Sequence, residues 1–238
     1  MTVIMIVQTP AIILKRFPFG DTSLIAHCFT RDYGKVSIMV RGAQRKKSPR
    51  SAYFQPANYL EVLMYYKPMR DLHTLSKVSF IKNWIHFQDD LKRLSYALVT
   101  VELVDKTIAD YDTHEDLFDE LVATLSFFHR EEKYFNLCFW YFELRLLKLL
   151  GFQPHLPDRK FPGMVLPDPN GGPNSRNILE FLIHTNINNP SFIEELSKQS
   201  VTPKDRHVIG NYITANLEYH FDSCRHLKSL KILKQLLS

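Results

Sequence analysis

The sequence predicts an α+β, multidomain protein in which a small β-barrel precedes a larger, all-α helical domain. Three observations predict this order. In the first eighty residues, apolar and polar residues alternate over short segments with the period of two that marks half-buried strands. From about residue 84, apolar residues recur every three or four positions, as in amphipathic helices. The charge changes in the same region, because residues 1–80 hold 12 Lys and Arg against 4 Asp and Glu, whereas residues 81–238 hold 18 against 21.

Five segments of the first eighty residues have the pattern of strands. Turn-forming residues separate them, among them the tetrad 31–34, which ends in glycine. A small closed barrel accommodates five short strands, and the OB-fold is the common five-stranded solution. We therefore predict a five-stranded OB-fold domain over residues 1–80. The predicted strands are 11–14, 24–30, 36–41, 59–65 and 72–78.

Helical periodicity dominates residues 81–238, which we predict to form the second domain. Asp89 or Asp90 can cap the first helix, and Thr113 with Asp116 resembles a capping box for the second. Residues 152–176 are rich in proline and glycine and predict a long irregular loop. The predicted helices are 91–108, about 113–128, 134–150, 177–184, 191–198 and 203 to the end.

The cysteines and the apolar segments indicate the cellular compartment. Cys28, Cys138 and Cys224 lie far apart, which suits a reducing cytosol better than a disulfide framework or a zinc site. The longest apolar run, 137–142, is too short to span a bilayer. The apolar residues 1–7 lack the basic segment and cleavage site of a signal peptide. We expect a cytoplasmic protein without membrane contact.

The strongest local feature is residues 41–50, here called the basic loop, which follow the third predicted strand. This segment holds no acidic residue, and its exposed cations are suited to bind phosphates. Arg31 and Lys35, around the preceding turn, are weaker candidates for the same role. A solvated surface loop and a contact for an acidic protein stay open as alternatives. The predicted DNA contacts of the basic loop are Arg41, Arg45, Lys46, Lys47 and Arg50.

Aromatic residues follow the basic loop and suggest a second kind of contact. Aromatic rings beside a cationic groove stack bases in sequence-tolerant single-strand binders. Their alternating spacing, however, predicts that most of them belong to the barrel core. The residues concerned are Tyr53, Phe54, Tyr59, Tyr65 and Tyr66.

The sequence offers no catalytic motif. Its glycines form no phosphate-binding loop, and it contains neither a G-x-S-x-G elbow nor an H-E-x-x-H pair. The acidic pairs Asp89-Asp90 and Glu131-Glu132 are typical of helix capping or solvation. We therefore expect no enzyme, no catalytic residue and no cofactor. A nuclease with a metal-binding carboxylate cluster remains an alternative, which the absence of Mg²⁺-dependent cleavage would exclude.

Residues 29–37 and the first eight residues of the basic loop closely resemble the N-terminal barrel of the RecO family of bacterial recombination mediators. The matching residues run from Phe29-Thr30-Arg31 through Asp32-Tyr33-Gly34 to Lys35-Val36-Ser37. Further matches follow in order along almost the whole chain: Gln55-Pro56, 60–66, 71–75, 146–154, Gly171-Gly172 and 227–230.

The resemblance implies an N-terminal OB domain that binds single-stranded and double-stranded DNA, followed by a helical domain. It implies annealing of complementary strands at the nucleoid and, with RecR, the loading of RecA on DNA coated by single-stranded-DNA-binding protein (SSB). It also implies that the helical domain binds the C-terminal tail of SSB. Such an acidic and aromatic tail needs cations at the edge of an apolar pocket, for which we select Arg130, Lys133 and Arg145. The alternative is a protein–protein adaptor of the repair machinery with only weak DNA contact.

Many RecO sequences carry a four-cysteine zinc site before the Gly-Gly pair, and this chain departs from that pattern. Residues 152–172 contain no cysteine, and we select His155 and Asp158 as the plausible ligands there. Two ligands do not make a structural zinc site. We therefore predict no metal and regard the loop 152–176 as a degenerate zinc-site region.

Overall fold

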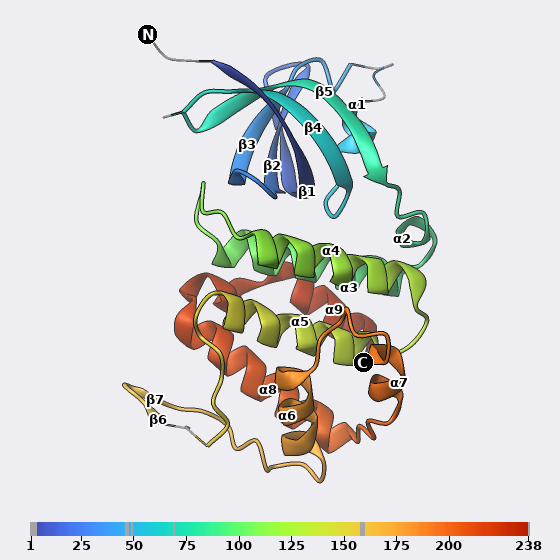
Figure 1. Cartoon of the computed structure of the whole chain (residues 1–238), viewed down its shortest axis with the longest axis vertical. Helices are drawn as coiled ribbons and strands as arrows, with labels where there is room; N and C mark the ends of the chain where they lie inside the picture. The colour runs from blue at the N-terminus through green and yellow to red at the C-terminus, as the bar shows by residue number, and fades with distance from the viewer. Residues whose placement is uncertain (1–3, 46–47, 49, 69, 158–159, 238) are drawn as a thin grey trace. The chain divides into compact units, whose positions relative to one another are not determined.

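A computed structural model describes residues 4–45, 48, 50–68, 70–157 and 160–237 of the chain (Figure 1). The chain folds as two compact units. Unit 1 comprises Met1–Leu125 and Leu227–Ser238, and unit 2 comprises Ser126–His226. The domain boundary that the sequence suggests after residue 80 stays a prediction, because compactness groups the barrel with the helices that follow it.

Five strands form a closed barrel in unit 1, as Figure 1 shows. The order is β1-β2-β3-β5-β4, and β1 closes the barrel by pairing with β4. All pairs are antiparallel except β3 with β5. This topology confirms the predicted α+β class with an N-terminal OB-fold. The strands are β1 (Met5–Phe19), β2 (Ser23–Thr30), β3 (Gly34–Val40), β4 (Tyr59–Tyr66) and β5 (Leu72–Lys82).

The barrel interior is filled by the apolar side of each alternating strand. Along β3, for example, Val36, Ile38 and Val40 are buried and the residues between them are half-buried. Burying each such side chain stabilises the fold by about 1.5–3 kcal/mol. The buried core of the barrel consists of Ala11, Ile13, Leu24, Ala26, Cys28, Val36, Ile38, Val40, Ala43, Phe54, Leu60, Val62 and Met64.

Helices complete unit 1. They are α1 (Arg50–Tyr53), α2 (His86–Asp89), α3 (Leu91–Thr107), the first part of α4 (Glu115–Arg130), and α9 (Lys228–Leu237). Asp90 caps α3, as the sequence predicts, and its carboxylate accepts hydrogen bonds from the backbone N–H groups of Lys92 and Arg93. Near the other end of the chain, the N–H groups of Lys228 and Ser229 donate to the carboxylate of Glu102 on α3 at 3.0 and 2.7 Å. The carboxylate thereby ties the start of α9 to α3.

The barrel packs on α3 and α4 within unit 1. Phe29 of β2 and Phe118 of α4 are fully buried, and their rings meet edge to face at 5.6 Å. Lys15 of β1 forms an ion pair of 2.7 Å with Asp105 of α3. Helices α3 and α4 thus cover the barrel around Phe29 and Lys15.

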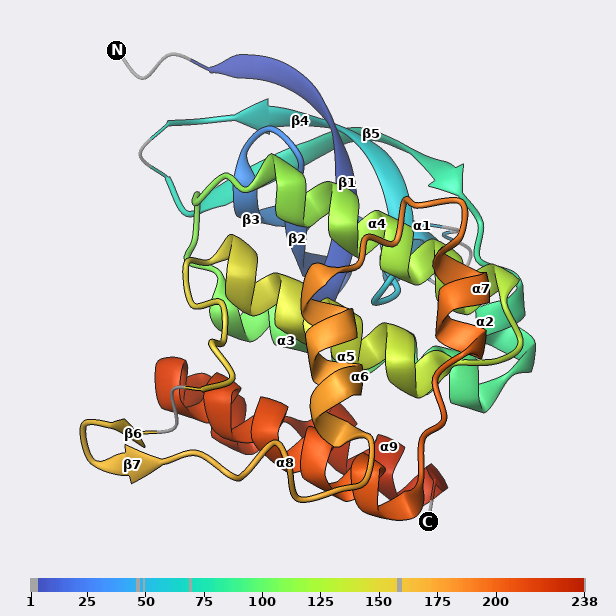
Figure 2. The same cartoon turned by 60° about the horizontal axis from the view of Figure 1, so that its bottom comes forward.

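Unit 2 is mainly helical. Its elements are α5 (Phe135–Leu149), β6 (Lys160–Phe161), β7 (Met164–Val165), α6 (Ser175–His184), α7 (Phe192–Ser197), α8 (Pro203–His220) and the 3₁₀ helix η1 (Asp222–His226). α5 is buried almost all round and packs on α6 and α8 (Figure 2). Gly151, with φ of 88°, ends α5, and the N–H groups of Gly151 and Phe152 donate to the carbonyls of Lys148 and Leu147. These two hydrogen bonds form a Schellman motif at the end of the helix.

Two features of the second half of the chain differ from the sequence-based expectation. The loop 152–176 is not wholly irregular, because β6 and β7 pair as a small antiparallel sheet around a turn at Gly163 (Figure 2). The final helical segment is not continuous, because α8 ends at His220 and η1 separates it from α9. Among the described residues, no helix combines the length and apolar composition that crossing a membrane requires.

Candidate nucleic-acid interface

The basic loop leaves the barrel at the end of β3, and two contacts anchor it. Ala43 is buried in the barrel core. The N–H of Gln44 donates to the carbonyl of Thr22, in the turn between β1 and β2, at 2.8 Å. Gly42 adopts a φ of 69°, a left-handed conformation that glycine reaches without strain. The loop is therefore held to the barrel by its backbone and by one small apolar side chain, and the side chains of Arg41, Gln44 and Arg45 lie at the surface.

Three arginines of this region surround one hollow. Arg41, Arg45 and Arg50 are exposed, and together with Gly42 and Ser48 they line a space of about 510 Å³. A guanidinium of Arg50 donates to the carbonyl of Arg41 at 3.1 Å, which holds two of the three arginines together. None of the carboxylates that the structure describes pairs with these three side chains. The hollow is a cationic site without an internal counter-charge.

The structure thus brings three of the five predicted basic-loop contacts together. Lys46 and Lys47 lie outside the described residues. Arg16 of β1 extends the cationic surface and was missed by sequence reasoning. Its guanidinium donates to the carbonyl of Ser51 at 2.9 Å, and it lines an adjoining hollow of about 370 Å³ with Gln44 and Ser51. Only the pairing of β1 with its neighbours places Arg16 near residues 44–51, and no local sequence signal indicates this.

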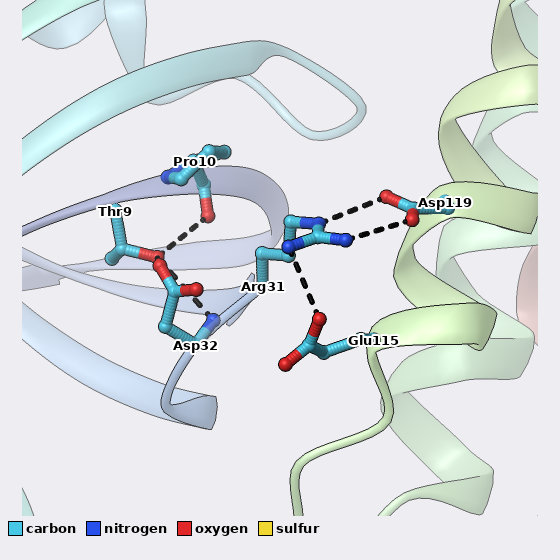
Figure 3. A network of polar contacts seen from close by, with 6 residues as sticks. All are labelled: Thr9, Pro10, Arg31, Asp32, Glu115 and Asp119. Atoms are coloured by element: carbon cyan, nitrogen blue, oxygen red, sulfur yellow. Dashed lines mark hydrogen bonds and ion pairs between the residues drawn. The ribbon is translucent and has the colours of Figure 1, made fainter.

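Arg31 lies at the opposite end of the β2–β3 pair and is occupied by carboxylates of the same unit. Its guanidinium donates twice to Asp119 of α4, at 3.1 and 3.0 Å, and pairs with Glu115 at 3.1 Å (Figure 3). The hydrogen bond and the charge of Asp119 raise the pKa of Arg31. The six-residue register between Leu24 and Thr30 separates this end from the basic loop by about 20 Å. A phosphate contact at Arg31 would have to displace two carboxylates.

Lys35 is also committed within unit 1. Its ammonium donates to the carbonyls of Asp105 and Ile108, at 3.1 and 2.8 Å, and lies 3.4 Å from the carboxylate of Asp110. Only 13% of its side chain is exposed. The ammonium therefore caps the carboxyl end of α3, where the helix dipole favours a cation. For Arg31 and Lys35 the DNA-binding role stays a prediction, and the geometry offers each of them a structural role.

Most of the aromatic residues after the basic loop belong to the barrel, as their spacing predicts. Phe54 is fully buried, and Tyr53 and Tyr66 pack against the core. Tyr65, by contrast, is 39% exposed on β4. Tyr53 stacks on Phe80 of β5 with 4.7 Å between the ring centroids, and Phe80 is itself 38% exposed. Exposed aromatic side chains are therefore present at Tyr65, which the sequence singled out, and at Phe80, which it did not.

The three candidates for the SSB tail lie in unit 2. Arg130 ends α4 and Lys133 precedes α5, and both are exposed. Arg145 is half-buried ten residues into α5, about 15 Å along the helix from Phe135. The structure thus places Arg130 and Lys133 near each other in the chain and Arg145 well away from them. The hollow of about 450 Å³ in unit 2 is lined by other residues, among them Phe181, His184 and Lys198.

Within the described part of the chain, no group of three or more His, Cys, Asp or Glu side chains is arranged to hold a metal ion. Of the two ligands considered in the loop 152–176, His155 is exposed and Asp158 lies outside the described residues.

Two family models match this chain, one over the barrel and one over residues that follow it. The family model described as "Recombination protein O N terminal" matches residues 4–84, which include the whole barrel. The model described as "Recombination protein O C terminal" matches residues 88–202. This chain belongs to the RecO family. The recognition made from residues 29–37 and the basic loop is confirmed.

Curated relatives of this chain are named DNA repair protein RecO. The DNA repair protein RecO of Salinibacter ruber is 34% identical over 149 residues, which cover 63% of this chain and 57% of the relative. The DNA repair protein RecO of Prosthecochloris aestuarii is 31% identical over 152 residues, or 64% of this chain and 58% of the relative. That of Alkaliphilus metalliredigens is 31% identical, with 64% and 61% covered. The alignments thus span about three fifths of the length of these RecO relatives.

Proposed function

We propose that this RecO-family chain acts in DNA repair and recombination by binding single-stranded and double-stranded DNA and annealing complementary strands. Family membership supports the repair role, since the relatives are named DNA repair proteins. The observation that carries the DNA-binding proposal is the hollow of Arg41, Arg45 and Arg50 with no carboxylate in its lining. Each guanidinium can bind a phosphate through two parallel hydrogen bonds.

Annealing by such a surface needs no covalent step. Two complementary strands repel each other because each carries a dense row of phosphate charges. A cationic surface lowers this repulsion and raises the local concentration of strands, while base pairing supplies the driving force. The protein then needs exposed cations on a rigid support, and the anchored backbone of residues 41–45 supplies that support.

We further propose the partners of the RecO family for this chain. It would cooperate with RecR to load RecA on SSB-coated DNA, and it would bind the SSB tail through unit 2, with Arg130, Lys133 and Arg145 as candidate contacts. The spacing of these cations supports a site at Arg130 and Lys133 more than one that includes all three. In this proposal the protein acts as a mediator in the cytoplasm, at the nucleoid, and makes or breaks no bond.

An annealing assay on SSB-coated complementary strands tests the proposal. The variant Arg41→Ala/Arg45→Ala/Arg50→Ala should anneal about tenfold more slowly than the wild type, because it lacks the charge that offsets strand repulsion. Removing the same charge from unit 2, with Lys148→Ala/Lys204→Ala/Arg206→Ala, should leave the rate nearly unchanged. Equal rates for the wild type and the basic-loop variant would refute the proposal. A gel shift on single-stranded DNA separates it from the adaptor alternative, which predicts little binding.

A further inference from the structure

The largest hollow described in unit 1 lies beside the basic loop, and its lining is aromatic and amide-rich where that of the arginine hollow is cationic. It has a volume of about 720 Å³ and is lined by residues between α1 and α3. We call it the aromatic groove. Its volume falls in the range of small-molecule and cofactor sites. Its lining residues are Ala52, Gln55, Pro56, Asn58, Phe80, Asn83, Trp84, Phe87, Gln88, Leu94 and Leu98.

Aromatic rings form one part of this lining. Trp84 is almost fully buried, and its indole N–H donates to the carbonyl of Ala57 at 3.0 Å, which fixes the ring. Phe87 stacks on Trp84 with 5.7 Å between centroids. Phe80 remains 38% exposed while it stacks on Tyr53. The groove therefore presents one accessible ring on a rigid aromatic base.

Amide side chains form the other part. Gln55, Asn83 and Gln88 are exposed at the groove, and their side chains make no hydrogen bond to any described residue. An amide carries both a donor and an acceptor, which is the combination that the edge of a nucleobase requires. The lining contains no carboxylate that would repel a phosphate strand, and the ammonium of Lys82 lies 4.7 Å above the ring of Trp84.

Helix α1 connects the aromatic groove with the cationic surface. Three consecutive residues of this single turn line three hollows: Arg50 the arginine hollow, Ser51 the hollow of Arg16, and Ala52 the aromatic groove. Successive residues of a helix are displaced by only 1.5 Å along its axis. A DNA strand whose phosphate is bound by Arg50 can therefore place its next bases in the aromatic groove.

We propose that the aromatic groove receives an unstacked nucleobase of single-stranded DNA whose phosphates lie on the arginine hollow. This inference rests on the proposed function and adds a contact with the bases to it. Phe80 provides the stacking face, and Asn83 and Gln88 provide hydrogen bonds to the edge of the base. Stacking on an aromatic ring accepts every base, so the groove supports binding without sequence preference.

The test compares single-stranded DNA with and without bases. The probe is a fluorescent oligothymidylate of about 20 nucleotides, enough to cover one OB-fold, and an abasic strand of equal length. Phe80→Ala should weaken binding of oligothymidylate by about tenfold, the size of one lost stacking contact. It should leave the abasic strand and the salt dependence unchanged, because no phosphate contact is removed. Asn83→Ala/Gln88→Ala, at exposed positions, should weaken the same binding without risk to the core.

Phe152→Ala is the matched control, because Phe152 has the same exposure as Phe80, also stacks on a neighbouring ring, and lies in unit 2, outside the proposed DNA-binding residues. Equal oligothymidylate affinity for the wild type, Phe80→Ala and the amide variant would overturn the inference while leaving the proposed function intact. If the wild type binds no DNA at all, the proposed function itself fails. A Trp140→Phe protein retains Trp84 as its sole tryptophan reporter. A fluorescence change with an acidic peptide and none with the oligonucleotide would assign the groove to a protein partner and contradict the inference.

Discussion

Replacing Gly34 by alanine should destabilise unit 1 through two separable effects. Gly34 starts β3 with a φ of 65°, a conformation that costs an alanine about 1–2 kcal/mol. A Cβ at this position would also lie 2.7 Å from the carbonyl carbon of Asp112, so the backbone at 110–112 must move. That movement breaks the hydrogen bond from the N–H of Tyr111 to the carbonyl of Lys35, worth about 1 kcal/mol. Together these effects predict a loss of about 2–3 kcal/mol.

Gly20→Ala separates the two effects. Gly20 has a similar φ of 57°, but a Cβ there would meet nothing within 4 Å. We expect this variant to lose only the conformational part, about 1–2 kcal/mol. Urea unfolding monitored by circular dichroism gives both values if the slope m is unchanged. Equal losses in the two variants would refute the claim that the segment 110–112 presses on the start of β3.

Three further predictions concern buried titratable groups. In Asp205 burial opposes ionisation, but hydrogen bonds from Thr202 and Asn174 hold its pKa below the ordinary 3.8. The ionised carboxylate therefore contributes fully to stability above about pH 3.8, and this contribution is lost as the pH falls further. Calorimetry should show this fall in stability with pH in the wild type and not in Asp205→Asn. Burial lowers the pKa of His73 below 6.5, so the stability of the wild type should fall as the pH drops below 6.5. The urea midpoint of His73→Phe should not show this dependence on pH. Burial raises the pKa of the Cys28 thiol, and Cys138 and Cys224 are buried as well. The cysteines should therefore react with Ellman's reagent only after the protein unfolds. Rapid labelling of the native protein would contradict the fold.

The sequence predicted the barrel strands and several helix ends well because the signals for these features are local. Alternation in β3 follows from the two faces of a strand, and Asp90 caps α3 through bonds to residues two and three positions away. Gly151 ends α5 for a similar local reason. Such features depend on a few neighbouring residues, so they can be inferred without knowledge of the tertiary structure.

The features that were missed depend on distant contacts. α9 joins α3 through Glu102, more than a hundred positions earlier, and no periodicity reveals that pairing. Arg31 looks like a free cation in the sequence, but Asp119 of α4 neutralises it in the fold. Arg16 and Phe80 enter the candidate interface only because β1 and β5 lie beside α1. A cation count along the chain therefore identifies the basic loop but not which other cations remain available to DNA.

The salt dependence of single-stranded DNA binding tests the central claim most directly. If Arg41, Arg45 and Arg50 each hold one phosphate, removing all three should reduce the slope of log K against log salt concentration by about 2, or about 0.7 for each contact. The control variant in Lys148, Lys204 and Arg206 should keep the wild-type slope. The account predicts the reduced slope for the arginine variant alone, and an unchanged slope in that variant would contradict it.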